Sequence, residues 1–391
     1  MNFFSTYFKG DRVIWLIVIF LSLFSILAVY SSTGTLAYKY HSGDTEFYLL
    51  RHFRTLIIGF ALIYVSHLLK YTVYARVSKI ALIITLPLLL LTLFLGTNLN
   101  DASRWLTVPG IGLSFQTSDL AKLALLLYVA RQLSIRQDNI KDFKSAFLPI
   151  MLPVLIACAF IIPANFSTAA LLFVTNVVLM FIGRISIKYI LALLGIGLLF
   201  LFMLIGLYLI APKVLPRFET WKNRIENFSG KGVKENYQTE QAKIAIAKGG
   251  LTGMGPGNST QRNFLPHPYS DFIFAIIIEE YGLVGGSFLV FLYLALFFRV
   301  IQIARKSPRA FATLLAIGCG FSLVFQAMIN MAVAVNLFPV TGQTLPLVSM
   351  GGTSIFFTGI SIGIILSVSR DLEKEELKSA QAQQKISAAV A

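Results

Sequence analysis

The chain has 391 residues and a formal net charge of +15, and 13% of its residues are charged. A soluble domain carries roughly 25% charged residues. Hydrophobic residues make up 56% of this chain, and its mean hydropathy is +0.75. This composition excludes soluble enzyme folds, secreted disulfide scaffolds and disordered proteins. It predicts an all-α integral membrane protein that crosses the bilayer many times.

The excess of positive charge does not indicate nucleic-acid binding. Lys and Arg residues lie between apolar runs, where the charges that orient a membrane protein are found. The two cysteines, Cys158 and Cys319, both lie inside apolar runs. They have no metal-binding spacing and suggest no disulfide framework, so we interpret them as small core residues.

The first apolar run extends from Val13 to Tyr30 and contains no charged residue. Lys9, Asp11 and Arg12 precede it, and no clear small-residue cleavage site follows it. The run is therefore predicted to be a first transmembrane helix and not a cleaved signal peptide.

Nine further spans follow from the same criterion of about 20 apolar residues. The expected ranges are residues 53–69, 77–97, 117–133, two helices within 144–184, 189–212, 271–298 and two helices within 310–369. The uncharged segment 336–349, between the last two spans, is rich in Pro and Gly, and we expect it to re-enter the membrane buried in protein. The chain is thus predicted to form one membrane domain of about ten helices, residues 1–370, and a charged cytoplasmic tail, residues 371–391.

The distribution of Lys and Arg predicts the orientation of these spans. With the N-terminus inside, the inside segments hold 19 Lys and Arg residues and the short outside loops hold four. Both termini are therefore expected in the cytoplasm. The segment of about residues 213–270, between the seventh and eighth helices, then becomes a large extracytoplasmic loop. Loops of this length usually carry function.

Charged residues inside a span are expensive and are therefore candidates for a functional site. Asp119 and Lys122 lie three residues apart on one face of the fourth predicted helix. One interpretation is a structural ion pair that offsets its own cost of burial. The other is that Lys122 points into a cavity and binds a phosphate.

Asp271 lies where the long outer loop meets the eighth predicted helix. An aspartate in the first turn of a helix often only complements the helix dipole. The functional interpretation is a carboxylate at the outer mouth of a cavity, suited to act as a general base or to bind a divalent cation. Glu279 and Glu280 lie deeper in the same helix, and at least one of them needs a polar partner inside the bundle.

The segment Gly249 to Gly257 contains five glycines in nine residues. It lacks the Gly-Lys-Ser/Thr ending and the preceding strand of a phosphate loop, so no nucleotide site is predicted. The glycines still permit a tight backbone path near a ligand. The four histidines, His41, His52, His67 and His267, show no metal-ligand spacing.

Four motifs resemble those of a known family. Residues 330–354 read NMAVAVNLFPVTGQTLPLVSMGGTS, and residues 247–285 read AKGGLTGMGPGNSTQRNFLPHPYSDFIFAIIIEEYGLVG after Tyr237, Gln238 and Gln241. Arg104-Trp105-Leu106 and the stretch from Gln116 to Leu125 supply two more matches in the expected order. Together they resemble the SEDS proteins (shape, elongation, division and sporulation), the family of FtsW, RodA and SpoVE.

The resemblance implies a peptidoglycan glycosyltransferase that polymerises lipid II into β-1,4 glycan still attached to undecaprenyl pyrophosphate. It implies a class B penicillin-binding transpeptidase and other divisome membrane proteins as partners, at the septum of the inner membrane, and no nucleic acid. The essential aspartate of the family falls on Asp271, with Mg or Mn as a divalent cation that Asp271 would bind. Residues expected to bind substrate are Lys122, Asp119, Arg104, Trp105, Gln238, Gln241, Ser349, Gly351 and Gly352, with Arg217 or Arg224 as further cations for the pyrophosphates.

The chain departs from the family pattern at several positions. Asn165 replaces an aspartate in the turn between the fifth and sixth helices, which puts any carboxylate role there in doubt. Pro266 to Asp271 lacks the usual Glu and His of the family. Asp119 is one methylene shorter than the usual Glu. We interpret these changes as lineage variation, and the compact chain and its GQTLP variant favour an FtsW-like division enzyme over a RodA-like elongation enzyme.

Two other functional classes stay open from the sequence. A lipid II flippase would require alternating access, and the chain shows no internal repeat or inverted pair of broken helices. A non-catalytic scaffold that activates its transpeptidase would not require Asp271, which is present.

Overall fold

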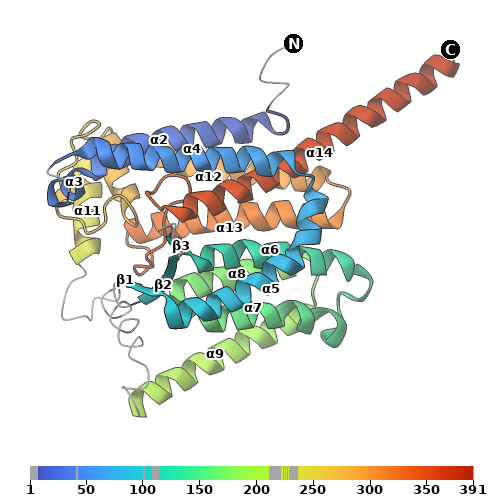
Figure 1. The fold of residues 1–391 in the computed structure, drawn as a ribbon, viewed down its shortest axis with the longest axis horizontal. Coiled ribbons are helices and arrows are strands. Elements are labelled where there is room, and N and C mark those ends of the chain that lie inside the picture. The colour runs from blue at the N-terminus through green and yellow to red at the C-terminus, as the bar shows by residue number, and fades with distance from the viewer. Residues whose placement is uncertain are drawn as a thin grey trace.

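The computed structural model describes residues 8–40, 43–99, 102–107, 114–210, 222, 224, 226, 228 and 237–390. Long helices lie side by side in one elongated bundle (Figure 1). The start of α2 and the end of α14 lie at one end of this bundle, here called the terminus end. Helices α3 and α11 and the small sheet lie at the opposite end, here called the loop end (Figure 1).

The described residues contain a long helix for each of the ten predicted spans. Seven helices are long and apolar enough to cross a membrane, α8 and the Ile187–Leu199 part of α9 are shorter apolar stretches, and α6 carries Asp119, Lys122 and Arg131. The ten are α2 (Arg12–Ser32), α4 (Thr45–Leu68), α5 (Tyr71–Leu95), α6 (Thr117–Ile135), α7 (Leu148–Ile161), α8 (Phe166–Ile182), α9 (Ile187–Ile210), α12 (Ile273–Lys306), α13 (Ala310–Ala334) and α14 (Thr353–Val390). Shorter helical pieces are α3 (Gly34–Tyr40), α11 (Tyr237–Gly249), Gln137–Asn139, Phe143–Phe147 and Gln261–Asn263.

Short polar side chains begin several of these helices. Asp11 accepts hydrogen bonds from the N–H groups of Val13 and Ile14, at 2.9 and 3.1 Å, and so caps α2. The same carboxylate accepts from Arg299 Nε of α12 at 2.9 Å, which ties α2 to α12 at the terminus end. Asn165 caps α8 by accepting from the N–H of Thr168 at 3.2 Å.

A three-stranded antiparallel sheet at the loop end was not predicted from the sequence. Its strands are β1 (Thr97–Leu99), β2 (Ala102–Thr107) and β3 (Ser114–Gln116), in the order β1-β2-β3. Trp105 of β2 lies opposite Gln116 of β3. Strands of three to six residues are too short to establish a clear alternating pattern, so the sequence shows a polar loop there.

Helix α12 is kinked at Gly282, whose φ is 68°. The kink frees backbone groups, and the glycine-rich segment 249–257 pairs with them. Met254 N–H donates to the carbonyl of Glu279, and Leu283 N–H donates to the carbonyl of Gly250, both at 2.9 Å. A Cβ added at Gly282 would lie 2.2 Å from the Leu251 oxygen, so glycine is required for this approach. The segment therefore docks on α12.

Glu279 and Glu280 are buried and both have polar partners, as expected for at least one of them. Glu279 Oε1 accepts from the N–H and hydroxyl of Thr260, both at 3.0 Å. Glu280 accepts from the hydroxyl of Ser31 in α2 and from the N–H of Ser259. The two carboxylates thus fix the outer loop to α12.

Helix α14 continues without a break from the last span into the charged tail. Arg370 is 4% exposed and donates to the carbonyls of His67 and Leu68, at 2.6 and 2.7 Å, where α4 ends. Just beyond it, Lys306 pairs with Glu376 at 3.3 Å. These contacts hold the first turns of the tail against the terminus end.

Candidate functional site

Asp271 lies at the loop end, two residues before α12 begins, and is half-buried. Its Oδ1 accepts a hydrogen bond from the Ser270 hydroxyl at 2.8 Å. A Cβ added at Gly342 would lie 3.6 Å from its Oδ2. The carboxylate is therefore placed against the segment that joins α13 to α14.

This segment, residues 335–352, is here called the connector. It contains three residues at positive φ before its end, Asn336 at 58°, Gly342 at 66° and Leu347 at 64°. Its Leu345, Leu347 and Val348 side chains are at most 3% exposed. The later part of the connector is thus buried in protein, whereas Leu337 and Phe338 near its start are 68% and 50% exposed. An irregular backbone is tolerated at membrane depth where it is buried in protein, and re-entry of this segment into the membrane stays a prediction.

Hydrogen bonds fix the connector to several helices. Gln326 of α13 donates its Nε2 to the Thr344 carbonyl at 2.9 Å, and Gln343 donates its Nε2 to the Thr168 hydroxyl of α8 at 2.8 Å. Tyr293 of α12 donates its hydroxyl to the Pro346 carbonyl at 2.6 Å. The segment beside Asp271 is consequently held by α12, α13 and the more distant α8.

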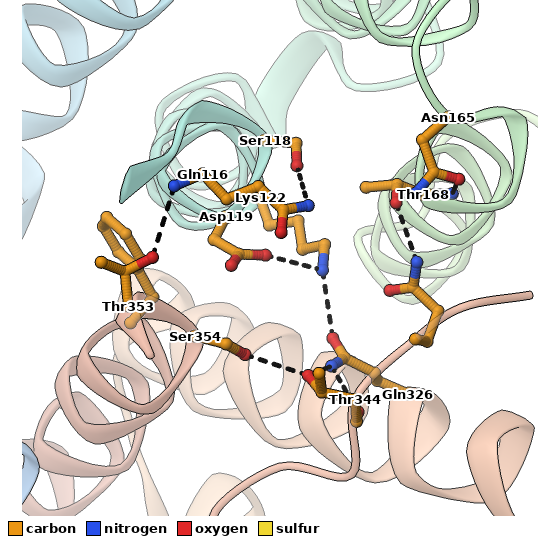
Figure 2. A network of polar contacts seen from close by, with 12 residues as sticks. Gln116, Ser118, Asp119, Lys122, Asn165, Thr168, Gln326, Thr344, Thr353 and Ser354 are labelled. Carbon is orange, nitrogen blue, oxygen red and sulfur yellow. Dashed lines mark hydrogen bonds and ion pairs between the residues drawn. The ribbon is translucent and has the colours of Figure 1, made fainter. Parts of the chain in front are cut away.

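Asp119 and Lys122 form an ion pair in α6, with 3.1 Å between Nζ and Oδ1. Lys122 also donates to Oε1 of Gln326 at 3.1 Å, so that Gln326 connects the pair to the connector (Figure 2). The Lys122 side chain is 15% exposed. The structural interpretation of this pair is thus supported by geometry, and a direct role of Lys122 in binding phosphate stays a prediction.

The connector links the surroundings of Lys122 to those of Asp271. Gly342 lies next to the aspartate, since a Cβ added there would be 3.6 Å from its Oδ2, and Thr344, two residues further on, accepts from the Gln326 side chain that binds Lys122. Sequence reasoning selected both charged groups, and it missed the amide between them. Gln326 and Asn330 lie four residues apart on one face of an otherwise apolar span, and this spacing is the signal that would have identified them.

An apolar cavity of about 370 Å³ adjoins this site. Residues of α8 and α13 and the start of the connector form its walls, and Thr341, the last of them, precedes Gly342. The guanidinium of Arg224 lies at the cavity and donates to the Val340 carbonyl at 3.0 Å. The apolar residues around it include Phe166, Ala170, Leu171, Val174, Phe325, Ile329, Phe338 and Pro339.

Other residues predicted to bind substrate lie around the loop end. Trp105 is half-buried in β2, and Arg104 is described only by its place in that strand. The N–H of Gln116 in β3 donates to the Thr353 hydroxyl of α14 at 3.3 Å, which places the sheet beside Gly351 and Gly352.

Three further residues predicted to bind substrate belong to the long loop between α9 and α12. Gln238 and Gln241 lie half-buried on α11, a helix that packs against α12. Arg217 lies outside the described residues. A contact of these three residues with substrate stays a prediction.

Ser349 has a different place from the one expected of a residue that contacts substrate. It is 1% exposed, and its Oγ donates to the Ser270 carbonyl at 2.6 Å and accepts from Leu345 N–H at 2.8 Å. It therefore supports the segment before Asp271 from inside the protein. Glu279 is 0% exposed and fully engaged with the outer loop, which makes it unsuited to replace Asp271 as a base.

Within the described ranges, no three His, Cys, Asp or Glu side chains gather in a group that could hold a metal ion. Asn165, at the position where the family has an aspartate, uses its side-chain oxygen to cap α8. An Mg²⁺ ion is ordinarily bound by one or two carboxylates together with substrate phosphates and water. Asp271 would be one such carboxylate, and a divalent cation at this position stays a prediction.

The fold and site define a class, the helical membrane proteins with a carboxylate at the loop end of the bundle and an apolar cavity beside it. The family model described as Cell cycle protein, for FtsW, RodA and SpoVE, matches residues 11–374. The chain belongs to this family.

Relatives with curated names cover nearly the whole chain. Stage V sporulation protein E of Bacillus subtilis is 33% identical over 92% of this chain and 97% of its own length. The probable peptidoglycan glycosyltransferase FtsW of Trichlorobacter lovleyi is 31% identical over 93% and 94% of the two chains. The protein of the same name from Haemophilus influenzae is 30% identical over 92% and 90%.

Solved structures share the fold. A chain in a structure described as "Structural coordination of polymerization and crosslinking by a peptidoglycan synthase complex" matches with a TM-score of 0.70 and 25% identity, over 93% of this chain and 98% of that one. The rod shape determining protein RodA of Thermus thermophilus matches with a TM-score of 0.66 and 25% identity, over 94% and 98%. The all-α membrane fold expected from the sequence is thereby confirmed.

Proposed function

We propose that this chain is a peptidoglycan glycosyltransferase that polymerises lipid II into β-1,4 glycan strands. Relatives that align over nearly its whole length carry the name peptidoglycan glycosyltransferase. The structural observation that carries the proposal is the position of Asp271 beside Gly342, where the wall of the apolar cavity ends. A lipid tail in the cavity would leave its head group at the carboxylate.

The reaction needs one base and stabilisation of a leaving group. A sugar hydroxyl of the acceptor attacks the anomeric carbon of the donor, and the bond from that carbon to the pyrophosphate oxygen breaks. The hydroxyl proton passes to the Asp271 carboxylate, and the pyrophosphate leaves with the bonding electron pair. A single in-line displacement inverts an α-linked donor to a β-linked product.

Cationic groups near the cavity suit the negative charge of the leaving group. Arg224 places its guanidinium at the cavity, and Arg guanidinium groups bind phosphate oxygens in a bidentate manner. A divalent cation held by Asp271 and the pyrophosphate would neutralise further charge on the phosphates. The donor arrives already activated on its lipid, so the reaction needs no nucleotide site.

The cavity walls suit a polyprenyl chain. They consist of Phe, Leu, Val, Ile, Ala and Pro side chains, with Ser167, Thr341 and Arg224 as the polar members. Burying an apolar chain there removes its surface from water or replaces lipid contacts with protein contacts. The same cavity would accept the lipid of the donor or of the growing strand.

A class B penicillin-binding transpeptidase is the partner that we propose, together with other divisome membrane proteins. The similarity to a chain of a peptidoglycan synthase complex supports a partner of this kind. We further propose that the protein acts at the division septum of the inner membrane with both termini in the cytoplasm. The excess of Lys and Arg in the predicted inside segments supports this orientation.

The activity is tested with purified protein and labelled lipid II in detergent, with its transpeptidase and Mg²⁺ or Mn²⁺ supplied. We expect glycan strands that a muramidase cuts to disaccharide units. Absence of strands under all these conditions would contradict the proposal. A flippase would instead move lipid II across vesicle membranes without making strands, and a scaffold would do neither.

A further inference from the structure

Three successive carbonyl oxygens before α12 each accept a hydrogen bond from a distant part of the chain. Met350 N–H donates to the Tyr269 carbonyl at 2.9 Å, and the Ser349 hydroxyl donates to the Ser270 carbonyl at 2.6 Å. Asn330 Nδ2 donates to the carbonyl of Asp271 itself at 2.9 Å. We call these three hydrogen bonds the carbonyl clamp.

The clamped segment has little regular structure of its own. Residues 266–272 form turns, His267 has a φ of 56°, and Ser270 N–H returns to the His267 carbonyl at 3.0 Å. α12 begins only at Ile273, and its N-cap, Phe272, has no side-chain oxygen with which to close the helix. The position of the Asp271 backbone therefore depends on partners outside the segment.

The chemistry of Asn330 fixes how it takes part. Its amide nitrogen donates both hydrogens, one to the Asp271 carbonyl and one to the Gln343 carbonyl at 2.6 Å. Both partners are acceptors, so the reverse orientation of the amide would place its oxygen against two carbonyls. Asn330 is 1% exposed, and it thus links the aspartate to the connector with a single, defined orientation.

Ser349 makes the second link from the connector. Its hydroxyl donates to the Ser270 carbonyl, and the hydroxyl oxygen accepts from Leu345 N–H. The hydroxyl proton therefore points at the Ser270 carbonyl. The adjacent Met350 N–H adds the third hydrogen bond. These contacts hold the reactive carboxylate against Gly342 from its backbone side.

We propose that Asn330 and Ser349 are positioning residues that hold Asp271 in the geometry required for glycosyl transfer. The inference rests on the proposed function and identifies which groups set the position of its base. A base displaced by about 1 Å can lose on the order of 100-fold in rate, because proton transfer depends steeply on geometry. The substrate would bind much as before, since neither residue is among those that line the apolar cavity.

The test compares four variants of the full-length protein in the polymerisation assay. Asn330→Ala and Ser349→Ala each remove a clamp donor, and Ser349→Thr keeps the hydroxyl. Tyr293→Phe is the matched control, because it removes a buried hydrogen bond to the connector, at the Pro346 carbonyl, without touching residues 269–271. We measure kcat and KM for lipid II, thermal unfolding, and backbone hydrogen exchange of residues 266–275.

We expect Asn330→Ala and Ser349→Ala to lower kcat by about 10- to 100-fold with little change in KM, and to speed exchange in residues 266–275. Ser349→Thr is expected to retain most of the wild-type kcat. Tyr293→Phe should lower the unfolding temperature by a similar amount and leave kcat and this exchange near wild type. If Asn330→Ala does not fold, the two Ser349 variants and Tyr293→Phe decide the question.

Clamp variants that polymerise lipid II as fast as Tyr293→Phe would overturn the positioning role alone. A wild-type protein that makes no strands would overturn the proposed function, and the role of the clamp with it. The two failures are distinguished by the activity of the wild type.

Discussion

At the scale of single residues, the ion pair of Asp119 and Lys122 shows how the bundle tolerates charge. The two side chains are 9% and 15% exposed, and Gln326 supplies a further acceptor to the ammonium group. Desolvation opposes such a pair, while loss of one partner leaves an uncompensated charge. The free energy of unfolding should therefore fall more when one partner is replaced than when both are replaced.

We predict that Lys122→Met lowers the free energy of unfolding by about 3 to 5 kcal/mol, because Asp119 is left buried without its cation. The double variant Asp119→Asn and Lys122→Met should recover most of this loss. Thermal or denaturant unfolding in detergent measures both effects. A double variant as unstable as Lys122→Met would contradict the ion-pair account, and its polymerisation rate shows separately whether Lys122 also acts on substrate.

The clamp residues belong to the same scale. The sequence motif identifies Asp271. The groups that donate to the three clamped carbonyls come from α13 and the connector, some 60 to 80 positions away. The spacing of Gln326 and Asn330 marks a polar face of α13 without showing which groups that face meets, and Ser349 has no distinctive local spacing. Long-range pairing of this kind is fixed by packing and becomes visible only in three dimensions.

At the scale of elements, the kink in α12 joins the outer loop to the bundle. The glycine-rich segment pairs with backbone groups that Gly282 frees, and Glu279 receives two hydrogen bonds from Thr260 at 3.0 Å. The sequence shows the glycines and the paired glutamates without showing that they meet. The loop leads directly to Asp271, so its attachment also constrains the site.

We predict different effects for replacements of two glycines that both have a positive φ. Gly282 and Gly257 have φ values of 68° and 77°. A Cβ at Gly282 would lie 2.2 Å from the Leu251 oxygen, while a Cβ at Gly257 meets nothing within 4 Å. Gly257→Ala should cost about 1 to 2 kcal/mol of backbone strain, and Gly282→Ala should be more destabilising by unfolding measurements. Equal losses would contradict close packing of the loop on α12.

At the scale of the whole molecule, the start of α2 and the end of α14 lie at one end, and α3, α11 and the small sheet lie at the other (Figure 1). Asp271 belongs to the segment that leads from α11 into α12. This arrangement separates the charged tail from the candidate site by the length of the bundle. It agrees with a site outside the membrane and a tail in the cytoplasm. The exposed apolar side chains of α9, including Leu199 and Phe202, suit contact with lipid.

We predict opposite labelling of two cysteine variants by a maleimide that does not cross membranes. Thr252→Cys, in the outer loop, should react in spheroplasts whose inner membrane is intact. Ser379→Cys, in the tail, should react only after the inner membrane is opened. Both positions are exposed, and the native Cys158 and Cys319 are buried and contribute little background. Labelling of both variants from outside would contradict the proposed orientation.

The sequence was sufficient to predict the membrane-spanning helices, and it was insufficient to predict the structure of the segments that connect them. Continuous apolar runs reveal spans because lipid requires about 20 such residues. The eighth span was expected to end near residue 298, and α12 continues to Lys306 because polar residues extend a helix beyond the membrane without an apolar signal. The small sheet and α11 form in segments with no strong hydrophobic periodicity, so the sequence alone did not predict them.

The measurement that bears most directly on the central claim is the rate of lipid II polymerisation by Asp271→Asn beside wild type. The replacement is nearly isosteric and removes the charge and the basicity of the carboxylate. Loss of a general base lowers rates by about 100- to 10,000-fold, so we predict a decrease in this range with normal folding and partner binding. Polymerisation by Asp271→Asn at the wild-type rate would contradict the account.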